Sequence, residues 1–136
     1  MILQNTYTLR VAYADTDQMG YVYYGQYARY FELARTELLR KHGISYKMLE
    51  AQGVMMPVTH FNTRYLKAAL YDDLLSIEVT VSEQPDRFMT FSYVVYNQDG
   101  LKLCDAETKL IFVDAHTRKS THVPPFLLAA FSNKES

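Results

Sequence analysis

The spacing of apolar side chains predicts one strand, a long helix, a short helix and then four more strands. Alternation over residues 6–13 is typical of a half-buried strand. Its apolar side consists of Tyr7, Leu9, Val11 and Tyr13. From residue 24 to residue 42 the apolar positions recur every three or four residues, which indicates a helix with one buried face. Gly43 predicts the end of this helix, and Ser45 predicts the start of a short helix over 46–52.

Most of the remaining chain alternates between apolar and polar residues. Strands are predicted over about residues 59–65, 75–81, 89–95 and 101–113. Asn97–Gly100 is a hairpin turn, and Pro124–Pro125 opens an apolar tail, 126–131, of one or two helical turns. Strands joined by tight turns are antiparallel. Because one helix cannot cover both faces of such a sheet, we expect the sheet to curl around it. The outer face or edge would then bind another subunit.

Composition restricts the class of protein. The chain has 136 residues, 49% hydrophobic and 21% charged, so we expect one globular domain over residues 1–136. A net charge of −1 disfavours nucleic acid as a partner. The single cysteine, Cys104, excludes an internal disulfide and cysteine-rich zinc sites, and we expect it in the core. We expect no membrane span and a cytoplasmic location, because neither a secretion signal nor about 18 consecutive apolar residues can be found.

The loop over residues 13–24 carries the clearest candidate chemistry. It holds Asp15, Asp17 and Gly20 just before the predicted long helix. A helix N-terminus presents unpaired backbone N–H groups, which can polarise a carbonyl and stabilise the oxyanion formed from it. A carboxylate on a loop folded against that terminus could attack the carbonyl or activate water.

Spacing alone also fits other interpretations of the two carboxylates. Two aspartates one residue apart can form a magnesium site, or can simply be solvated loop side chains. The run also begins like a calcium loop, with Asp15, Asp17 and Gly20 at positions one, three and six. Met19 and Gln26 stand where such a loop needs oxygen ligands, so the calcium interpretation fails.

Three segments of the chain resemble one known family. They are Tyr13-Ala14-Asp15-Thr16-Asp17-Gln18-Met19-Gly20-Tyr21-Val22-Tyr23 with Tyr27 and Phe31-Glu32-Leu33-Ala34-Arg35, then Tyr65 to Asp73, then Val113-Asp114 with Thr117-Arg118-Lys119 and a proline pair. In this order they resemble the hot-dog acyl-CoA thioesterases of the 4-hydroxybenzoyl-CoA thioesterase type. The similarity spans nearly the whole chain, and its first segment is the most specific.

The resemblance implies an α+β hot-dog fold, in which an antiparallel sheet of five or six strands wraps around one long helix. It also implies a homo-oligomer, a dimer or a homotetramer, with active sites between subunits. Asp17 would be the nucleophile or general base, and a backbone N–H near Tyr24 or Gly25 would polarise the thioester carbonyl. Coenzyme A is part of the substrate, so neither a separate cofactor nor a metal is expected.

The resemblance also suggests which residues contact the substrate. Those expected at the acyl thioester are Gly20, Val22, Tyr23 and Tyr27. Among the cations that could reach the phosphates of coenzyme A (Arg64, Lys67, Arg87, Arg118 and Lys119), the adjacent pair Arg118 and Lys119 is favoured. Asp15 is expected to shape the loop by accepting backbone N–H bonds.

The sequence departs from the family pattern at two positions. Tyr24 stands where many relatives carry a histidine, and a tyrosine is a poor base at neutral pH, so more of the chemistry falls on Asp17. The segment Lys67-Ala68-Ala69 lacks a proline that often precedes the second alanine, which should alter a bend. Two further hypotheses remain open: a thioesterase for acyl groups on acyl carrier protein, and a non-catalytic hot-dog protein that binds an acyl ligand.

Overall fold

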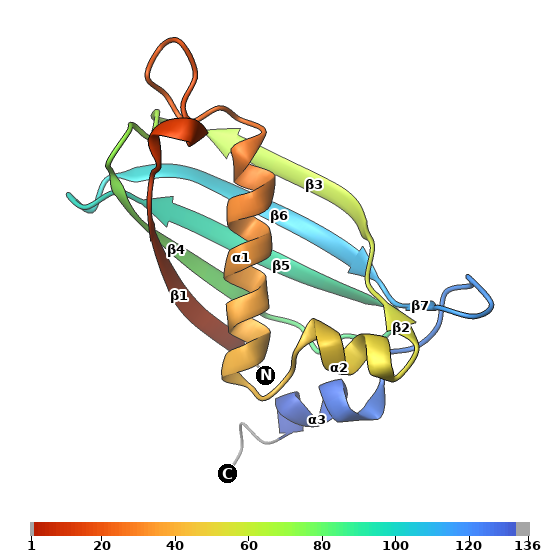
Figure 1. Cartoon of the computed structure of the whole chain (residues 1–136). Coiled ribbons are helices and arrows are strands. Elements are labelled where there is room, and N and C mark those ends of the chain that lie inside the picture. The colour runs from red at the N-terminus through yellow and green to blue at the C-terminus, as the bar shows by residue number, and fades with distance from the viewer. Residues whose placement is uncertain (1, 133–136) are drawn as a thin grey trace.

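A computed structural model describes residues 2–132 of the chain. Its main feature is a five-stranded antiparallel sheet in the order β1-β4-β5-β6-β3, crossed on one face by the long helix α1 (Figure 1). The strands of this sheet are β1 (Leu3–Arg10), β3 (Val58–Tyr65), β4 (Leu74–Val81), β5 (Phe88–Tyr96) and β6 (Lys102–Ile111). The predicted α+β architecture, a sheet wrapped around one long helix, is confirmed.

Helix α1 (Gln26–Lys41) forms the centre of the core because its apolar residues fall on one face. The buried apolar residues of this face are Tyr27, Tyr30, Phe31, Ala34, Leu38 and Leu39. Phe31 stacks on Tyr93 of β5, with ring centroids 4.4 Å apart. Beyond the helix, Gly43 has a φ of +81°, which lets the Ile44 N–H reach the Leu39 carbonyl at 2.9 Å. Ile44 is buried there, so the predicted helix stop is confirmed.

The burial of β4 and β5 follows the predicted alternation. The residues turned toward α1 are almost fully buried; they are Leu75, Ile77, Val79, Val81, Met89, Phe91, Tyr93 and Val95. Cys104 of β6 is also buried, as predicted, and burial raises the pKa of its thiol to about 12. A neutral buried thiol is inert, so Cys104 packs as a small apolar residue.

The first strand ends at Arg10, three residues earlier than the alternation over residues 6–13 predicts. It stops at Arg10, and the Val11 N–H then bonds to the Asp73 carbonyl at 2.9 Å. Tyr13, predicted on the strand, instead opens a 3-10 turn, η1 (Tyr13–Asp15), and is 77% exposed. The prediction for Tyr13 was wrong because a tyrosine alternating with polar residues fits an exposed turn as well as a strand.

The last predicted strand is divided in two. It leaves the main sheet after Ile111, and a short strand β7 (Val113–Asp114) pairs instead with β2 (Val54–Met55). Between the two parts lies Phe112, which is fully buried and donates its N–H to the Arg87 carbonyl at 3.1 Å. Burial of this ring directs the chain away from β6.

Two short helices lie at the end of the molecule that carries β2 and β7 (Figure 1). Helix α2 (Tyr46–Ala51) begins where predicted, since the Ser45 hydroxyl accepts the Met48 N–H at 3.1 Å. Helix α3 (Pro125–Ser132) is the predicted apolar tail. Within residues 2–132, no helix combines the length and the apolar character needed to cross a bilayer.

Strand β3 is an edge of the sheet and is far more exposed than the central strands. All but one of its residues are exposed. Phe61 and Tyr65 lie toward α1, where their rings contact Phe31 and Tyr27, yet they remain 42% and 49% exposed. The sheet therefore ends on this side in a strand whose aromatic side chains are only partly covered.

Candidate active site

The loop between β1 and α1 folds back on itself as a small hairpin. The Asp17 N–H donates to the Tyr21 carbonyl at 2.8 Å, and Thr16 and Val22 form an antiparallel bridge. Gly20 closes the turn with a φ of +80°, a conformation that glycine adopts without strain, and its N–H bonds to the Asp17 carbonyl at 3.0 Å. Main-chain bonds thus define the position of Asp17.

This hairpin is docked against the connection between β3 and β4. The Val22 N–H donates to the Ala69 carbonyl at 2.8 Å, and Tyr21 bridges Leu70. Ala69 is buried beneath the contact. As a result, the loop before the helix and the segment after β3, far apart in sequence, form two sides of one cavity.

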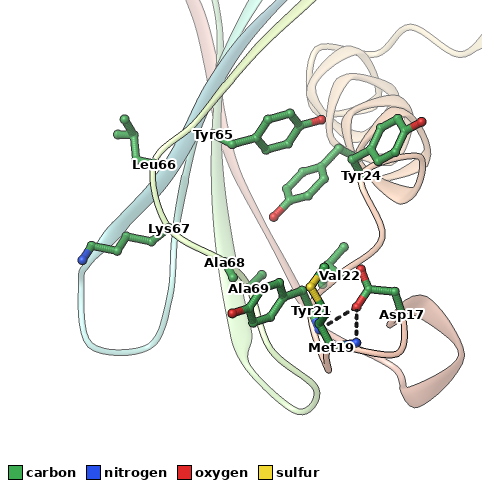
Figure 2. Close-up of a pocket in the computed structure, with 11 residues that line it drawn as sticks. Asp17, Met19, Tyr21, Val22, Tyr24, Tyr65, Leu66, Lys67, Ala68 and Ala69 are labelled. Atoms are coloured by element: carbon green, nitrogen blue, oxygen red, sulfur yellow. Dashed lines mark hydrogen bonds between the residues drawn. The ribbon is translucent and has the colours of Figure 1, made fainter.

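The Asp17 carboxylate is oriented by two donors from its own loop. Its Oδ1 accepts the Met19 N–H at 2.9 Å and the Tyr21 N–H at 3.2 Å (Figure 2). Among residues 2–132, the structure records no hydrogen bond to its Oδ2. An ionised carboxylate accepts bonds at both oxygens, so Oδ2 can attack a carbonyl carbon or take a proton from water.

The N-terminus of α1 contributes the second part of the site. The helix begins at Gln26 rather than at residue 24, because Tyr24 and Gly25 form a turn that is closed by the bond from the Gln26 N–H to the Tyr23 carbonyl at 2.8 Å. Within the described chain, the amides of Tyr24 and Gly25 donate to no recorded acceptor. These two N–H groups could donate hydrogen bonds to an oxygen of a ligand.

Gly25 has a packing role at this terminus. A Cβ at this position would lie 2.7 Å from the Tyr23 ring, which is too close for any real contact. The Tyr23 and Tyr24 rings in turn contact each other, with centroids 4.8 Å apart. The glycine therefore lets an aromatic ring fold over the start of the helix.

Asp17 and Tyr24 share a cavity of about 340 Å³ (Figure 2). Its walls come from the loop, the helix and the end of β3: Asp17, Met19, Tyr21, Val22, Tyr24, Tyr27, Tyr65, Leu66, Lys67, Ala68 and Ala69. Most of these side chains are aromatic or aliphatic, whereas Asp17 and Lys67 are charged. A mainly apolar cavity of this size with a few polar groups is typical of a small-ligand site.

Burial keeps one of the cavity's tyrosines in its neutral form. Tyr27 is 3% exposed, and loss of solvation, followed by the neighbouring Cys104 and Tyr65, raises the pKa of its phenol. Tyr27 is thus a hydrogen-bonding group at neutral pH and not a base.

Asp15 has a different environment from Asp17. It is 6% exposed, and its Oδ2 accepts the Tyr30 hydroxyl at 2.8 Å and the Ala12 N–H at 3.3 Å. Its Oδ1 accepts Arg29 Nη2 at 3.1 Å. This environment matches the expectation that Asp15 shapes the loop, and adds two side-chain partners from α1.

The structure brings some of the predicted site residues together and separates others. Val22, Tyr24 and Tyr27 line the cavity with Asp17, whereas Gly20, Tyr23 and Gly25 shape its surroundings without lining it. Arg118 and Lys119 follow β7, at the opposite end of the sheet from the Asp17 loop (Figure 1). Within one subunit they do not meet the cavity, so their role stays a prediction.

Sequence reasoning missed much of the cavity wall. Tyr65 ends β3, Leu66 and Ala69 follow it, and Lys67, one of the five cations named from the sequence but not the favoured pair, also lines the cavity. The segment from Tyr65 to Asp73 matched the family pattern, which was the available signal. The alternation itself shows which face of a strand is buried but not which loop lies beside its end.

A curved antiparallel sheet wrapped around one long helix is the hot-dog fold, and in this chain a loop with two carboxylates lies just before that helix. The chain belongs to the thioesterase-like superfamily, whose family model matches residues 11–131.

Individual relatives are similar over most of their length. The chain is 32% identical to the acyl-CoA thioester hydrolase YbgC of Escherichia coli O6:H1, over 90% of this chain and 92% of that protein. It is 35% identical to the acyl-CoA thioesterase YbgC of Haemophilus influenzae, over 93% of each. The crystal structure of the DHNA-CoA thioesterase from Staphylococcus aureus superposes with a TM-score of 0.90 at 30% identity, covering 97% of this chain and 91% of that one.

Proposed function

We propose that this protein hydrolyses acyl-CoA thioesters, with Asp17 as the catalytic carboxylate. One observation carries the proposal: Asp17 and Tyr24, which stands two residues before the start of α1, line the same mainly apolar cavity. Acyl transfer requires a nucleophile or base on one side of a carbonyl and hydrogen-bond donors on its oxygen. The relatives named above as acyl-CoA thioesterases support the same reaction.

In the proposed reaction, the thioester carbonyl lies between Asp17 and the Tyr24 and Gly25 amides. Those N–H groups donate to the carbonyl oxygen and stabilise the oxyanion. Asp17 either attacks the carbonyl carbon, releasing the thiolate of coenzyme A and leaving an anhydride that water hydrolyses, or removes a proton from an attacking water. Both routes consume one water and yield a carboxylic acid and a thiol.

The proposal is tested by measuring thiol release from a panel of acyl-CoAs with short, long, branched and aromatic acyl groups. We expect turnover of at least one class, and a loss of about a hundredfold or more in kcat for Asp17→Asn. Near-full activity of that variant would exclude the catalytic assignment. The same acyl groups on acyl carrier protein separate the two carriers, and tight acyl-CoA binding without turnover would identify a non-catalytic binding protein.

We also propose that the active unit is a homo-oligomer joined through β3. An exposed edge strand with partly covered aromatic residues is a surface that a second sheet can extend. In such a pair a neighbouring subunit could bring its Arg118 and Lys119 toward the cavity, which one subunit alone does not. The number of subunits, two or four, is part of this proposal.

Two matched substitutions test this interface. Phe61 on β3 and Phe88 on β5 are 42% and 43% exposed, but only Phe61 lies on the edge strand. We expect Phe61→Lys to reduce the mass measured by sedimentation and to lower activity, and Phe88→Lys to keep the mass of the wild-type oligomer. A wild-type protein that sediments as a monomer would contradict the proposal.

A further inference from the structure

Asp15 is a buried carboxylate that the proposed reaction does not use. Its side chain is 9% exposed and contacts the second turn of α1, where the Tyr30 hydroxyl and the Arg29 guanidinium bond to separate oxygens. Burial of Tyr30, followed by its hydrogen bond to Asp15, raises the pKa of the phenol, so the hydroxyl stays a donor. A carboxylate held by two side chains of one helix is fixed relative to that helix.

The same residue is joined to the Asp17 hairpin by its main chain. The Asp15 carbonyl accepts the Tyr23 N–H at 2.9 Å, at the base of the hairpin that Thr16 and Val22 continue. Asp17 follows only two residues later. The base of the hairpin is therefore attached to α1 through Asp15, while its other side is attached to Ala69.

These two attachments have different consequences for the site. The bond to Ala69 sets the hairpin against the end of β3. The bonds from Asp15 to Tyr30 and Arg29 set it against the helix whose N-terminus holds the Tyr24 and Gly25 amides. The reaction depends on the distance from the Asp17 carboxylate to those amides. The contacts of Asp15 with α1 help to set that distance.

We infer that Asp15, Tyr30 and Arg29 form a positioning cluster that holds the Asp17 carboxylate at its working distance from the N-terminus of α1. The inference rests on the proposed catalytic role of Asp17. Displacement of a reacting group by about 1 Å can reduce a rate about a hundredfold, so partial release of the hairpin should act mainly on kcat. Substrate binding depends on the cavity walls, which the cluster does not line.

The test compares two buried tyrosine hydroxyls. Tyr30 donates to Asp15 at 2.8 Å, and Tyr93, away from the cavity, shares a 2.7 Å hydrogen bond with Thr108. Tyr30→Phe and Tyr93→Phe each remove one buried hydroxyl and should lower the unfolding temperature similarly. We expect Tyr30→Phe to lower kcat about tenfold with KM within about twofold, and Tyr93→Phe to keep both within about twofold. Wild-type kcat in Tyr30→Phe, or an equal loss in Tyr93→Phe, would overturn the inference.

A second variant covers the case in which Tyr30→Phe does not fold. Arg29 is 51% exposed, so Arg29→Gln removes the other contact to Asp15 without opening the core. We expect a loss of about threefold in kcat with KM unchanged. Wild-type kcat in this variant would count against the cluster.

A double-mutant cycle separates this inference from the proposed function. If Tyr30 acts through Asp17, Tyr30→Phe should cause no further loss in an Asp17→Asn background. An undiminished tenfold loss there would show that Tyr30 acts by another route and would refute the positioning role alone. Full activity of Asp17→Asn itself would refute the catalytic role proposed for Asp17, and the positioning role with it.

Discussion

Two turns of this protein have the same construction, and one of the two lines the cavity of the candidate active site. In the first, Asp17 Oδ1 accepts the N–H groups of Met19 and Tyr21 at 2.9 and 3.2 Å, and Gly20 has a φ of +80°. In the β5–β6 hairpin the corresponding residues are Asn97, Asp99, Gly100 and Leu101. The two matching distances there are 3.0 and 3.1 Å, and the glycine φ is +77°.

The main chain closes both turns in the same way as well. The Asp17 N–H donates to the Tyr21 carbonyl at 2.8 Å, and the Asn97 N–H donates to the Leu101 carbonyl at 3.0 Å. The second turn shows that an asparagine oxygen is sufficient for this geometry. A carboxylate at position 17 is therefore not required to build the turn, which agrees with the catalytic role proposed for Asp17 in the cavity that it lines.

The largest difference in kcat is expected between two separate variants, Asp17→Asn and Asn97→Asp. Asp17→Asn should keep the unfolding temperature within about two degrees, because Asn97 supports the same turn, yet lower kcat about a hundredfold or more. Asn97→Asp should keep kcat within about twofold. Parallel thermal unfolding and thiol-release assays on both variants measure this contrast. Loss of folding in Asp17→Asn would mean that the two turns are not equivalent.

Substitutions of the two turn glycines should have intermediate effects. Both should lower stability, but one of the two should also lower kcat. Gly20 and Gly100 both have positive φ, and neither would bring a Cβ within 4 Å of another atom. Each change to alanine should cost about 1 kcal/mol of unfolding free energy through backbone strain alone. Only Gly20→Ala should also lower kcat, by about tenfold, because it displaces Asp17. Denaturant unfolding and kinetics check both parts, and equal kinetic losses in the two variants would contradict the comparison.

A third turn, in which Asp114 has two main-chain donors, should show the smallest effect. Asp114 Oδ1 accepts the Thr117 and His116 N–H groups, which hold the pKa of its carboxyl below the usual range. A lowered folded-state pKa stabilises the protein above the unfolded pKa of about 3.9, and the contribution is lost as pH falls through the folded value. The difference in unfolding temperature between wild type and Asp114→Asn should therefore shrink on acidification from pH 6 to pH 3. A difference that does not depend on pH would contradict this account.

Local patterns predicted the elements well where one periodicity dominated. Spacing alone predicts the buried face of α1 and the buried faces of β4 and β5. Backbone preferences predict the helix end at Gly43 and the hairpin turn at Gly100. The ends of strands were less predictable. Tyr13 continued the alternation but lies in the 3-10 turn η1, two residues after Val11, whose main chain still bonds to Asp72 and Asp73.

The site was predictable on one side only. Asp17 and the helix terminus lie close together in sequence, so their association was visible in the loop. The opposite wall, from Tyr65 to Ala69, depends on the docking of Val22 on the Ala69 carbonyl, a main-chain contact with no side-chain signal. Similarly, an adjacent cation pair such as Arg118 and Lys119 does not reveal at which end of the sheet it lies.

A crystal structure of the Asp17→Asn variant with an intact acyl-CoA would test the central claim most directly. We predict that the thioester carbonyl oxygen accepts a hydrogen bond from the Tyr24 or Gly25 amide, and that the carbonyl carbon faces the side chain at position 17. The acyl group should occupy the cavity and contact Tyr27 and Tyr65, which line it. A thioester bound away from this helix terminus, with the cavity unfilled, would contradict the account.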